Sequence, residues 1–468
     1  NNKLYVIENK IVKTYLDVSS KFPYFAEEPR LGSGFGFFAF HPEFASNGKF
    51  YTVHTERFDA LTINTPDFVS NGTDDMHGII TEWTATNPSL NEFAGSKREV
   101  LRIGFDTYLH GFQQISFNPT AEPGNEDYGL LYLALGDGEE NPVFSGAPQD
   151  LSVPHGKILC IDPLGNNATN GNYGIPTTNP FVSTNDALGE IWAYGFRNPH
   201  RFSWDLEGSN KMFIGNIGEK NIDAIYLGEK GANYGWNERE GSFLFKKDDP
   251  NNVYALPEDD ATNNYTYPVA EYDHDEGFAV VSGFVYRGNL IPGLKGKYIF
   301  GDIVKGRVFY MEEHEMIKNQ SFTKIHEFFI YDDNGNRTSM LNLAGNSRAD
   351  LRFGLDAQNE LYLLSKQNGK IWKAIGANGL SVDSFTNKVA IKTFPNPTED
   401  VINFSTNATE FGSIKIAIYN LMGQEIKTIN LKKSTNTIKV SVSDLPKGIF
   451  LVKLINSKIN YTTKFVKE

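Results

Sequence analysis

The sequence has 468 residues, and its 44 Lys and Arg against 57 Asp and Glu give a formal net charge of −13 at pH 7. This acidic balance argues against nucleic acid as a partner, because nucleic-acid-binding proteins present basic patches. The single cysteine, Cys160, excludes an intrachain disulfide and a cysteine-rich metal site, and no run of 18 apolar residues predicts a membrane span.

A hydrophobic pair that includes an aromatic residue recurs near the start of β-rich runs along residues 1–376. No long helical periodicity separates the copies. Weakly repeated short strands are typical of a β-propeller, in which four-stranded sheets surround a central channel. The copies therefore predict an all-β chain that begins with a six-bladed β-propeller; a sandwich, or several small β domains, is the alternative. The six copies lie at Leu4-Tyr5, Phe50-Tyr51, Leu131-Tyr132, Met212-Phe213, Tyr298-Ile299 and Leu361-Tyr362.

Two segments bring chemically active residues to the ends of predicted strands. The first, DTYLHGFQQISFNP, places His110 just before a strand, and the second, GEIWAYGFRNPHRFSWD, interrupts a strand-forming run with Arg197, Asn198 and Pro199. Proline has no N–H for a β-ladder, so the arginine is expected at a strand end or in a loop. In a propeller such ends converge on one face, where a histidine base and a guanidinium would form a redox or hydrolytic pocket. A purely structural role for His110 is the alternative.

A glycine-rich turn, GNIGEKNID at residues 215–223, follows another predicted strand. Its backbone carbonyl groups, with Asp223 nearby, suit an oxygen-binding cation such as calcium, although an ordinary tight turn is the alternative. A second candidate is the loop EYDHDEG, where acidic residues surround His274 and could equally be a solvated surface. The sequence contains no EF-hand loop, P-loop, dinucleotide fingerprint, nucleophile elbow or zinc-ligand spacing.

The chain changes character near Ala377, where GANGLSVDSFTNK is small and polar. Residues 377–385 are predicted to be a linker. Alternating β runs follow over residues 386–468, with turns at LMGQE and LPKG, and aromatic residues become fewer. This second part is predicted to be a separate, small β-sandwich.

Many separate motifs of residues 1–375 keep a fixed order, among them FGFFAFHPEFASNGKFYT, GLLYLALGDG, APQDLSVPHGKILCIDP, GEIWAYGFRNPHRFSWD and VSGFVYRGNLIPGLKGKYIFGDIVKGRV. In this order they resemble the soluble glucose/sorbosone dehydrogenases. That family consists of six-bladed propellers that use pyrroloquinoline quinone (PQQ), and it includes the aldose sugar dehydrogenases and the hedgehog-interacting-protein-like branch. The resemblance implies a PQQ- and calcium-dependent enzyme that oxidises an aldose or related sugar by hydride transfer to the quinone.

The resemblance also implies roles for individual residues at the matching positions. His110 matches the base that takes the proton from the sugar's anomeric hydroxyl group. Arg197 and Asn198 match the pair that contacts the polar edge of the quinone. The main-chain carbonyl groups of Gly218 and Glu219 match those that hold calcium.

Two further cations are implied by the same resemblance. Arg287 in VYRG and Arg348 in GNSRADLRFGLD match basic residues near the carboxylates of the cofactor, with Arg352 as a rival to Arg348. Since PQQ has three carboxylates, cations are expected to surround it, and calcium is expected to stabilise the charge of the reduced quinone.

The sequence departs from the family pattern around this pocket. Ser33 stands where the family usually has a glutamine that touches the quinone, and Leu109 stands before the histidine in place of Asn or Asp. Phe112 and Gln113 occupy a stretch that usually holds glycines, and the calcium turn reads GNIGE rather than Gly-Asp-Val-Gly-Gln. These changes point to altered specificity or to a lost cofactor. A non-catalytic secreted propeller that binds a glycan or protein, and a calcium-dependent lactonase or similar hydrolase, are therefore the alternative functions.

The last domain carries the motifs FPNP, IYNLMGQEI, LPKGIFLVKL and TTKFVKE. They resemble the type A sorting tails of the type IX secretion system, as found in Bacteroidetes. The resemblance implies that the type IX machinery is a partner and that the protein is exported across the outer membrane. We therefore expect an extracellular or cell-surface protein.

Overall fold

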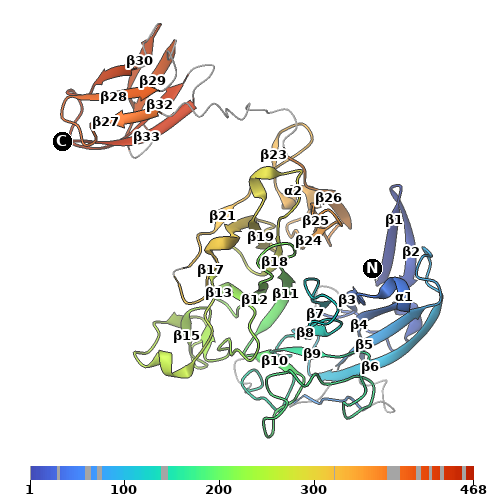
Figure 1. Ribbon diagram of the computed structural model, residues 1–468. Helices are drawn as coiled ribbons and strands as arrows, with labels where there is room; N and C mark the ends of the chain where they lie inside the picture. The colour runs from blue at the N-terminus through green and yellow to red at the C-terminus, as the bar shows by residue number, and fades with distance from the viewer. Residues whose placement is uncertain are drawn as a thin grey trace. The chain divides into compact units, whose positions relative to one another are not determined.

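The computed structural model describes the chain except for residues 1, 29–31, 58–64, 71–75, 139–145, 321, 377–390, 407–412, 421–423, 433–436 and 456–459. The chain divides into two compact units, Asn1–Gly376 and Ala377–Glu468. Their regular secondary structure is mainly β-strand (Figure 1), and the α-helices of the described residues are the short α1 (Phe44–Asn47) and α2 (Met340–Ala344). The predicted all-β class is confirmed. None of the described helices is long and apolar enough to cross a membrane, and the predicted linker at 377–385 lies outside the described residues.

The first unit contains six antiparallel sheets of three or four strands among the described residues, and five of them are the main sheets. In chain order the sheets are β3 (Phe35–Phe40), β4 (Lys49–Arg57), β5 (Met76–Ala85) and β6 (Gly95–Phe105); β7 (Phe112–Phe117), β8 (Leu131–Leu135), β9 (Lys157–Ile161) and β10 (Ile191–Tyr194); β11 (Asn198–Trp204), β12 (Met212–Ile217), β13 (Ile222–Leu227) and β17 (Ala270–Asp273); β18 (Val280–Val285), β19 (Lys297–Asp302), β20 (Val308–Glu312) and β21 (His326–Glu327); β24 (Leu351–Leu355), β25 (Leu361–Ser365) and β26 (Lys370–Lys373).

Smaller sheets lie beside these five. They are the hairpins β1 (Lys3–Glu8) with β2 (Ile11–Asp17) and β22 (Ile330–Tyr331) with β23 (Arg337–Thr338), and the three short strands β14 (Arg239–Glu240), β15 (Phe243–Phe245) and β16 (Val253–Tyr254).

The repeated hydrophobic pair marks one position in this architecture. Five of its six copies lie in β4, β8, β12, β19 and β25, the second strand of each sheet, and the first copy lies in β1. Second strands are flanked by strands on both sides, and in β8 all five residues are buried, which explains their continuous apolar character. The remaining copy, in β1, belongs to a two-stranded hairpin among the described residues, so the count of six blades stays a prediction.

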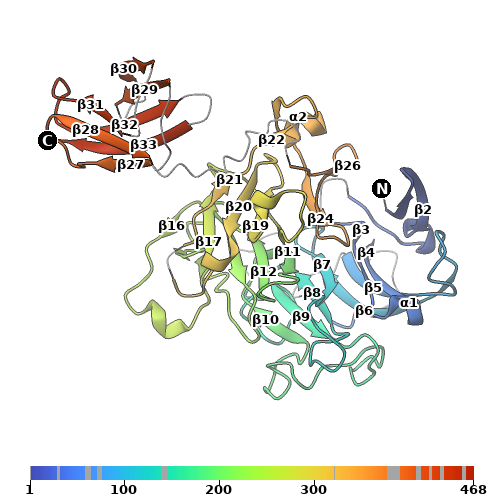
Figure 2. The same ribbon diagram turned by 45° about the horizontal axis from the view of Figure 1, so that its top comes forward.

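The first strands of the five sheets lie side by side. Contacts join β3 to β7, β7 to β11, β11 to β18 and β18 to β24, so these inner strands follow one another in an arc (Figures 1 and 2). Their starting ends lie together, because the N–H of Gly32, before β3, donates to the carbonyl of Tyr108, before β7, at 2.8 Å. The N–H of Asp137, beyond β8, donates to the carbonyl of Arg197, before β11, also at 2.8 Å. We call this end of the inner strands the starting face.

The second unit contains two sheets. One comprises β27 (Ile391–Phe394), β28 (Val401–Thr406) and β31 (Thr437–Ser441), and the other comprises β29 (Ile414–Tyr419), β30 (Glu425–Leu431), β32 (Gly448–Ile455) and β33 (Asn460–Lys467). A single apolar core joins the two sheets, with Phe404 of β28, Ile416 of β29 and Val452 of β32 fully buried in it. This is the architecture of a β-sandwich.

Candidate functional site

The starting face is built from one junction that three sheets repeat. In each, the end of the second strand lies beside the start of the inner strand, with Phe112 opposite Leu135, Asn198 opposite Ile217 and Leu351 opposite Ser365. A residue before the inner strand therefore meets a residue after the second strand. The pairs that result are His110 with Asp137, Arg197 with Glu219, and Asp350 with Lys366.

His110 is held by a buried carboxylate. Its Nδ1 lies 2.7 Å from Oδ1 of Asp137, whose side chain has no exposed surface. The other carboxylate oxygen of Asp137 accepts a hydrogen bond from Nε1 of Trp236 at 3.0 Å. An ionised carboxylate only accepts, so Nδ1 carries the proton and Nε2 is left with its lone pair. With 14% of its side chain exposed, His110 can act as a base toward a bound molecule.

The close approach of the His110 backbone explains why residue 136, the first glycine of the GDG motif, is a glycine. His110 has φ 51°, in the left-handed region. A Cβ added at Gly136 would lie 2.4 Å from the carbonyl oxygen of His110 and 2.6 Å from its Cβ. Only glycine therefore lets the two strand ends approach closely enough for Asp137 to reach the histidine.

Arg197 is engaged by the turn that was predicted to bind calcium. Its Nε and Nη2 lie 2.9 and 2.6 Å from the same carboxylate oxygen, Oε2 of Glu219. The two side chains are 11% and 12% exposed. Arg197 thus lies where the sequence predicted it, between β10 and β11, but with an internal carboxylate against its guanidinium.

The turn from Gly218 to Ile222 is fixed by Glu240, which is buried. Oε1 of Glu240 accepts the N–H groups of four successive residues, from Glu219 to Ile222, at 2.8–3.1 Å. The carbonyl oxygens of Gly218 and Glu219 accept no hydrogen bond from the described part of the chain. Such oxygens suit calcium. No group of three or more His, Cys, Asp or Glu side chains among the described residues is arranged to hold a metal, so a cation here would depend on the main chain.

The acidic loop before β18 contributes one histidine to the surroundings of this turn. His274 Nε2 lies 3.7 Å from Oδ1 of Asp223, and this carboxylate raises the pKa of the histidine. Burial raises the pKa of Asp223, whose Oδ1 also accepts the N–H of Gly218 at 3.0 Å. Asp223 therefore supports the turn from beneath.

Two other predicted residues, Asn198 and Ser33, lie at the starting face and differ in whether their polar side-chain atoms have hydrogen-bond partners. Asn198 is buried, and its Oδ1 has no hydrogen-bond partner among the described residues. The hydroxyl of Ser33 is used within its own loop, where it accepts the N–H of Glu28 at 2.7 Å and donates to the carbonyl of the same residue at 3.3 Å.

The predicted cations are divided between the two ends of the inner strands. Arg348 precedes β24 at the starting face, where its Nε pairs with Oδ1 of Asp350 at 2.5 Å and its side chain is 41% exposed. Arg287 follows β18 and pairs with Asp205, which follows β11, at 2.8 and 2.6 Å. The structure therefore places Arg287 at the end opposite to His110 and does not bring the two together.

Two hollows lie away from the starting face. One, of about 350 Å³, is lined at the far ends of β3 and β7 by residues such as Phe40 and Phe117. The other, of about 610 Å³, lies among outer loops near Asn166 and Thr178. Neither is lined by the predicted site residues, so the chemistry of the side chains, rather than the size of a hollow, identifies the site.

Sequence reasoning missed Asp137 and Glu240 as parts of the site. For Asp137 a signal was available: it stands two residues beyond a predicted strand, just as His110 stands two residues before one, and antiparallel neighbours bring such positions together. Glu240 carried no signal of this kind.

Comparison with known proteins gives the following similarities. Residues 28–329 match the glucose/sorbosone dehydrogenase family, and residues 392–468 match the secretion system C-terminal sorting domain. The HIPL1 protein of Arabidopsis thaliana is 27% identical over 315 residues, which cover 61% of this chain and 43% of that protein. The aldose sugar dehydrogenase YliI of Escherichia coli is 34% identical over 108 residues, which cover 23% of this chain and 26% of that protein.

A solved structure has a similar fold. The aldose sugar dehydrogenase of Streptomyces coelicolor, in its PQQ-bound form, is 19% identical and has a TM-score of 0.50; the match covers 81% of this chain and 86% of that one. At this identity the likeness concerns the fold alone. The curated relatives named above are matched over less than half of their own length.

Proposed function

The chain belongs to the glucose/sorbosone dehydrogenase family, and from this premise we propose that it is a secreted, PQQ- and calcium-dependent enzyme that oxidises an aldose or a related sugar. The observation that carries the proposal is His110 held by buried Asp137 beside the Arg197 junction. We propose with it that the first unit is a six-bladed propeller over residues 1–376 and that residues 386–468 form the sorting domain.

The residues present fit the two cofactors. Arg197 offers guanidinium N–H donors that suit the oxygen atoms at the polar edge of a quinone. Buried Asn198 offers an amide oxygen, unpartnered among the described residues, that can accept a hydrogen bond from a donor group of the ligand. The carbonyl oxygens of Gly218 and Glu219 suit calcium. When bound, PQQ supplies the acceptor for a hydride, and calcium supplies a Lewis acid.

The chain's own chemistry is a proton transfer. Nε2 of His110, the nitrogen that Asp137 leaves free, accepts the proton of the sugar's anomeric hydroxyl group as the hydride leaves the same carbon. Buried Asp137 then stabilises the imidazolium that forms, and the N–H of Trp236 keeps that carboxylate oriented. Arg348 at the starting face, with Arg352 beside it, supplies the further cations that we propose for the cofactor's carboxylates.

Reconstitution tests this function. PQQ and calcium are added to the full chain, and bleaching of an artificial electron acceptor is followed with a panel of sugars. We expect bleaching with at least one aldose, its loss in His110→Ala, and its retention in His326→Ala, which changes a histidine of β21 outside the site. No bleaching with any sugar, together with no change in quinone absorbance, would contradict the proposal.

A second function is favoured by one specific contact. The guanidinium of Arg197 is already paired with Glu219, so no anionic cofactor is needed to neutralise its charge. In that case the protein is a non-catalytic secreted propeller that binds a glycan or protein on the starting face. Failure of PQQ binding, with retention of glycan binding that His110→Ala leaves intact, would favour this function.

Export is proposed from the second unit. Its match to a secretion sorting domain supports recognition by the type IX secretion machinery and a final location outside the cell or on its surface. A truncation after residue 385 is expected to leave the first unit folded but retained in the periplasm of the native host. Normal secretion of the truncated chain would contradict this assignment.

A further inference from the structure

The loop that carries Trp236 reaches Asp137 from a different sheet. This loop, residues 228–237, follows β13, whereas Asp137 follows β8. Trp236 is 2% exposed, and its Nε1 donates to Oδ2 of Asp137 at 3.0 Å. An indole ring has one N–H and no acceptor, so the placement of the loop decides whether Asp137 keeps this hydrogen bond. The contacts that fix the loop therefore bear on the carboxylate behind the base.

Two amide side chains join this loop to the connection between β8 and β9. Nδ2 of Asn233, in the loop, donates to Oε1 of Gln149 at 2.7 Å, and Nε2 of Gln149 donates back to Oδ1 of Asn233 at 3.0 Å. The same Nε2 also donates to the carbonyl of Trp236 at 2.6 Å. Both amide side chains belong to half-buried residues, so their hydrogen bonds are partly shielded from water. We call the pair Gln149–Asn233 the amide clasp.

The amide clasp closes over a glycine. A Cβ added at Gly195, which has φ 79°, would lie 2.3 Å from Oδ1 of Asn233. The carbonyl of Gly195 accepts the N–H of Trp236 at 2.9 Å, and its own N–H donates to the carbonyl of Pro148 at 3.1 Å. Three segments that are far apart in the sequence therefore meet at one point, just before β11.

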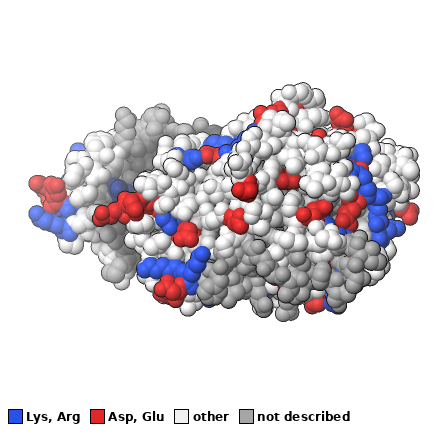
Figure 3. All heavy atoms as spheres, turned by 90° about the horizontal axis from the view of Figure 1, so that it is seen from below, with Lys and Arg blue, Asp and Glu red and all other residues white. Residues whose placement is uncertain are grey.

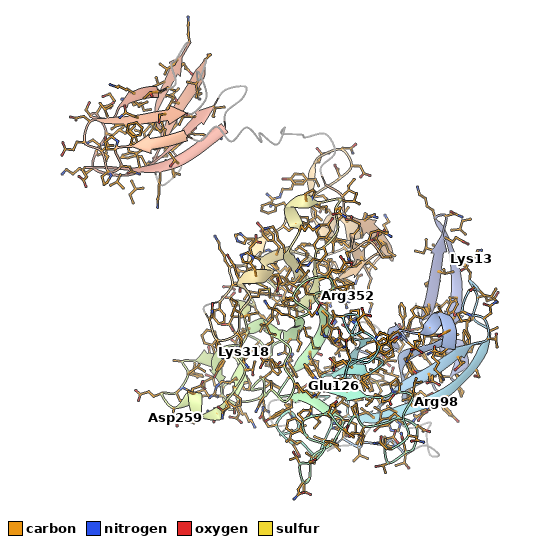
Figure 4. All side chains as sticks on the ribbon, viewed as in Figure 1. Lys13, Arg98, Glu126, Asp259, Lys318 and Arg352 are labelled. Carbon is orange, nitrogen blue, oxygen red and sulfur yellow. The ribbon has the colours of Figure 1, made fainter. Side chains whose placement is uncertain are left out.

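The outer end of the same loop is held by charge. Lys230 pairs with Glu126 and Glu229 pairs with Lys318, and all four side chains are 35–50% exposed. Figure 4 shows that the two partners, Glu126 and Lys318, lie apart from each other. Mixed charges of this kind are general on the surface, where Figure 3 shows basic and acidic side chains next to one another. Exposed ion pairs contribute at most about 1 kcal/mol, so they hold the loop only weakly.

We propose that Gln149 and Asn233 are positioning residues for the proposed base. Their clasp holds the N–H of Trp236 on Asp137, and Asp137 in turn holds Nδ1 of His110. The three successive hydrogen bonds measure 2.6, 3.0 and 2.7 Å. Because the clasp is neutral, it orients the carboxylate without placing a further charge beside it. The inference rests on the proposed function, since it concerns the same base.

The first test observes the base in the full chain without quinone or calcium. Nuclear magnetic resonance follows the Nδ1–H proton of His110, assigned by its absence from His110→Ala. We expect this proton to exchange with water about 3- to 10-fold faster in Gln149→Met and in Trp236→Phe, because each removes one of the successive hydrogen bonds. The same result is expected for Gln149→Glu, which keeps the shape of the side chain and the acceptor for Asn233 but loses both donors.

A double variant separates positioning from a general loss of stability. If the clasp acts through the N–H of Trp236, Gln149→Met should not accelerate the exchange any further in the Trp236→Phe background. In the reconstituted enzyme, Gln149→Met should lower kcat about 3- to 10-fold at unchanged KM. Lys230→Met, which breaks the outer ion pair of the same loop, is the matched control and should leave exchange and turnover unchanged.

Three results would overturn the proposal. They are exchange in Gln149→Met as slow as in the wild type, a double variant whose acceleration is the product of the two separate ones, and loss of the fold in both Gln149 variants. The last would make the clasp a purely structural element. Accelerated exchange together with no turnover of any sugar by the wild type would instead support the clasp and contradict the proposed function.

Discussion

Arginines near the two ends of strand β11 differ in whether a carboxylate neutralises their charge. At the far end, Asp205 accepts both Arg287 hydrogen bonds, at 2.8 and 2.6 Å, and the N–H of Ser209 at 2.5 Å. At the starting face, Arg201 and Arg352 have no carboxylate partner among the described residues. The same residue type is therefore structural where its donors are satisfied and available for a ligand where they are not. The starting face thus holds both kinds of arginine, since Arg197 and Arg348 are paired there, whereas Arg287 at the far end is paired with Asp205.

The largest effect is expected at the saturated end. Arg287→Met leaves Asp205, which has no exposed surface, as an unpaired buried carboxylate, so the free energy of unfolding should fall by about 3 kcal/mol. Urea unfolding measures the loss. Arg307→Met, which breaks a partly exposed pair with Glu327, is the control and should cost less than about 1 kcal/mol. Quinone affinity should not change; a large drop in affinity with unchanged stability would instead support the cofactor role that the sequence predicted for Arg287.

At the starting face, the next largest effect is expected from the base. His110→Ala should lower turnover roughly a hundredfold while quinone affinity stays constant, since general-base catalysis acts on the chemical step. Asp137→Asn should also lower turnover, because an amide can hold the wrong imidazole tautomer. Steady-state kinetics and quinone titration on both variants provide the measurement. Equal turnover in His110→Ala and the wild type would remove His110 from the mechanism.

Arg197 offers a direct comparison with Arg287. Arg197→Ala should weaken quinone binding by about 1.5–3 kcal/mol, the value of a charged hydrogen bond, while lowering the melting temperature less than Arg287→Met does. Absorbance titration and thermal unfolding of the two variants, side by side, check both parts. Wild-type quinone affinity in Arg197→Ala, with only a change in melting temperature, would make this arginine structural too.

The sequence predicts more of the fold than of the site. Copies of a hydrophobic pair mark the second strands because those strands are covered on both sides, and this burial is visible as composition. His110 and Arg197 were predicted to lie on one face because strand ends converge there, whereas the role of Gly218 came from the family resemblance. Two features of the site were missed. Arg287 follows its strand and therefore lies at the end opposite to His110, whereas the family resemblance had assigned both residues to one pocket.

The second unpredictable feature is the direction of Arg201. The register between β11 and β12 shifts between Pro199 and Arg201. Such an irregularity breaks the alternation by which side chains are assigned to the two faces of a strand. The contacts of Arg201 with the carbonyl of Gln113 in β7 and with the ring of Phe37 in β3 could not therefore be predicted from its position in the sequence.

The smallest effect is expected at Glu219. Its substitution tests most directly whether the ion pair with Glu219 keeps Arg197 from binding a ligand. Glu219→Gln keeps the shape of the side chain and restores the residue of the usual family turn, but it removes the charge that holds Arg197 at 2.6–2.9 Å. The main-chain hydrogen bond from this residue to Glu240, at 2.8 Å, does not involve the side chain, so the calcium turn should persist.

An anionic quinone then no longer competes with an internal carboxylate for Arg197. Its affinity, measured at saturating calcium, should rise about 2- to 5-fold, equivalent to about 0.5–1 kcal/mol. Glu327→Gln, which frees Arg307 on the outer surface, should leave the affinity unchanged. A fall in affinity would mean that the Glu219 carboxylate helps to hold the ligand. Arg197 would then be a structural arginine neutralised by its carboxylate partner, as Arg287 is at the far end.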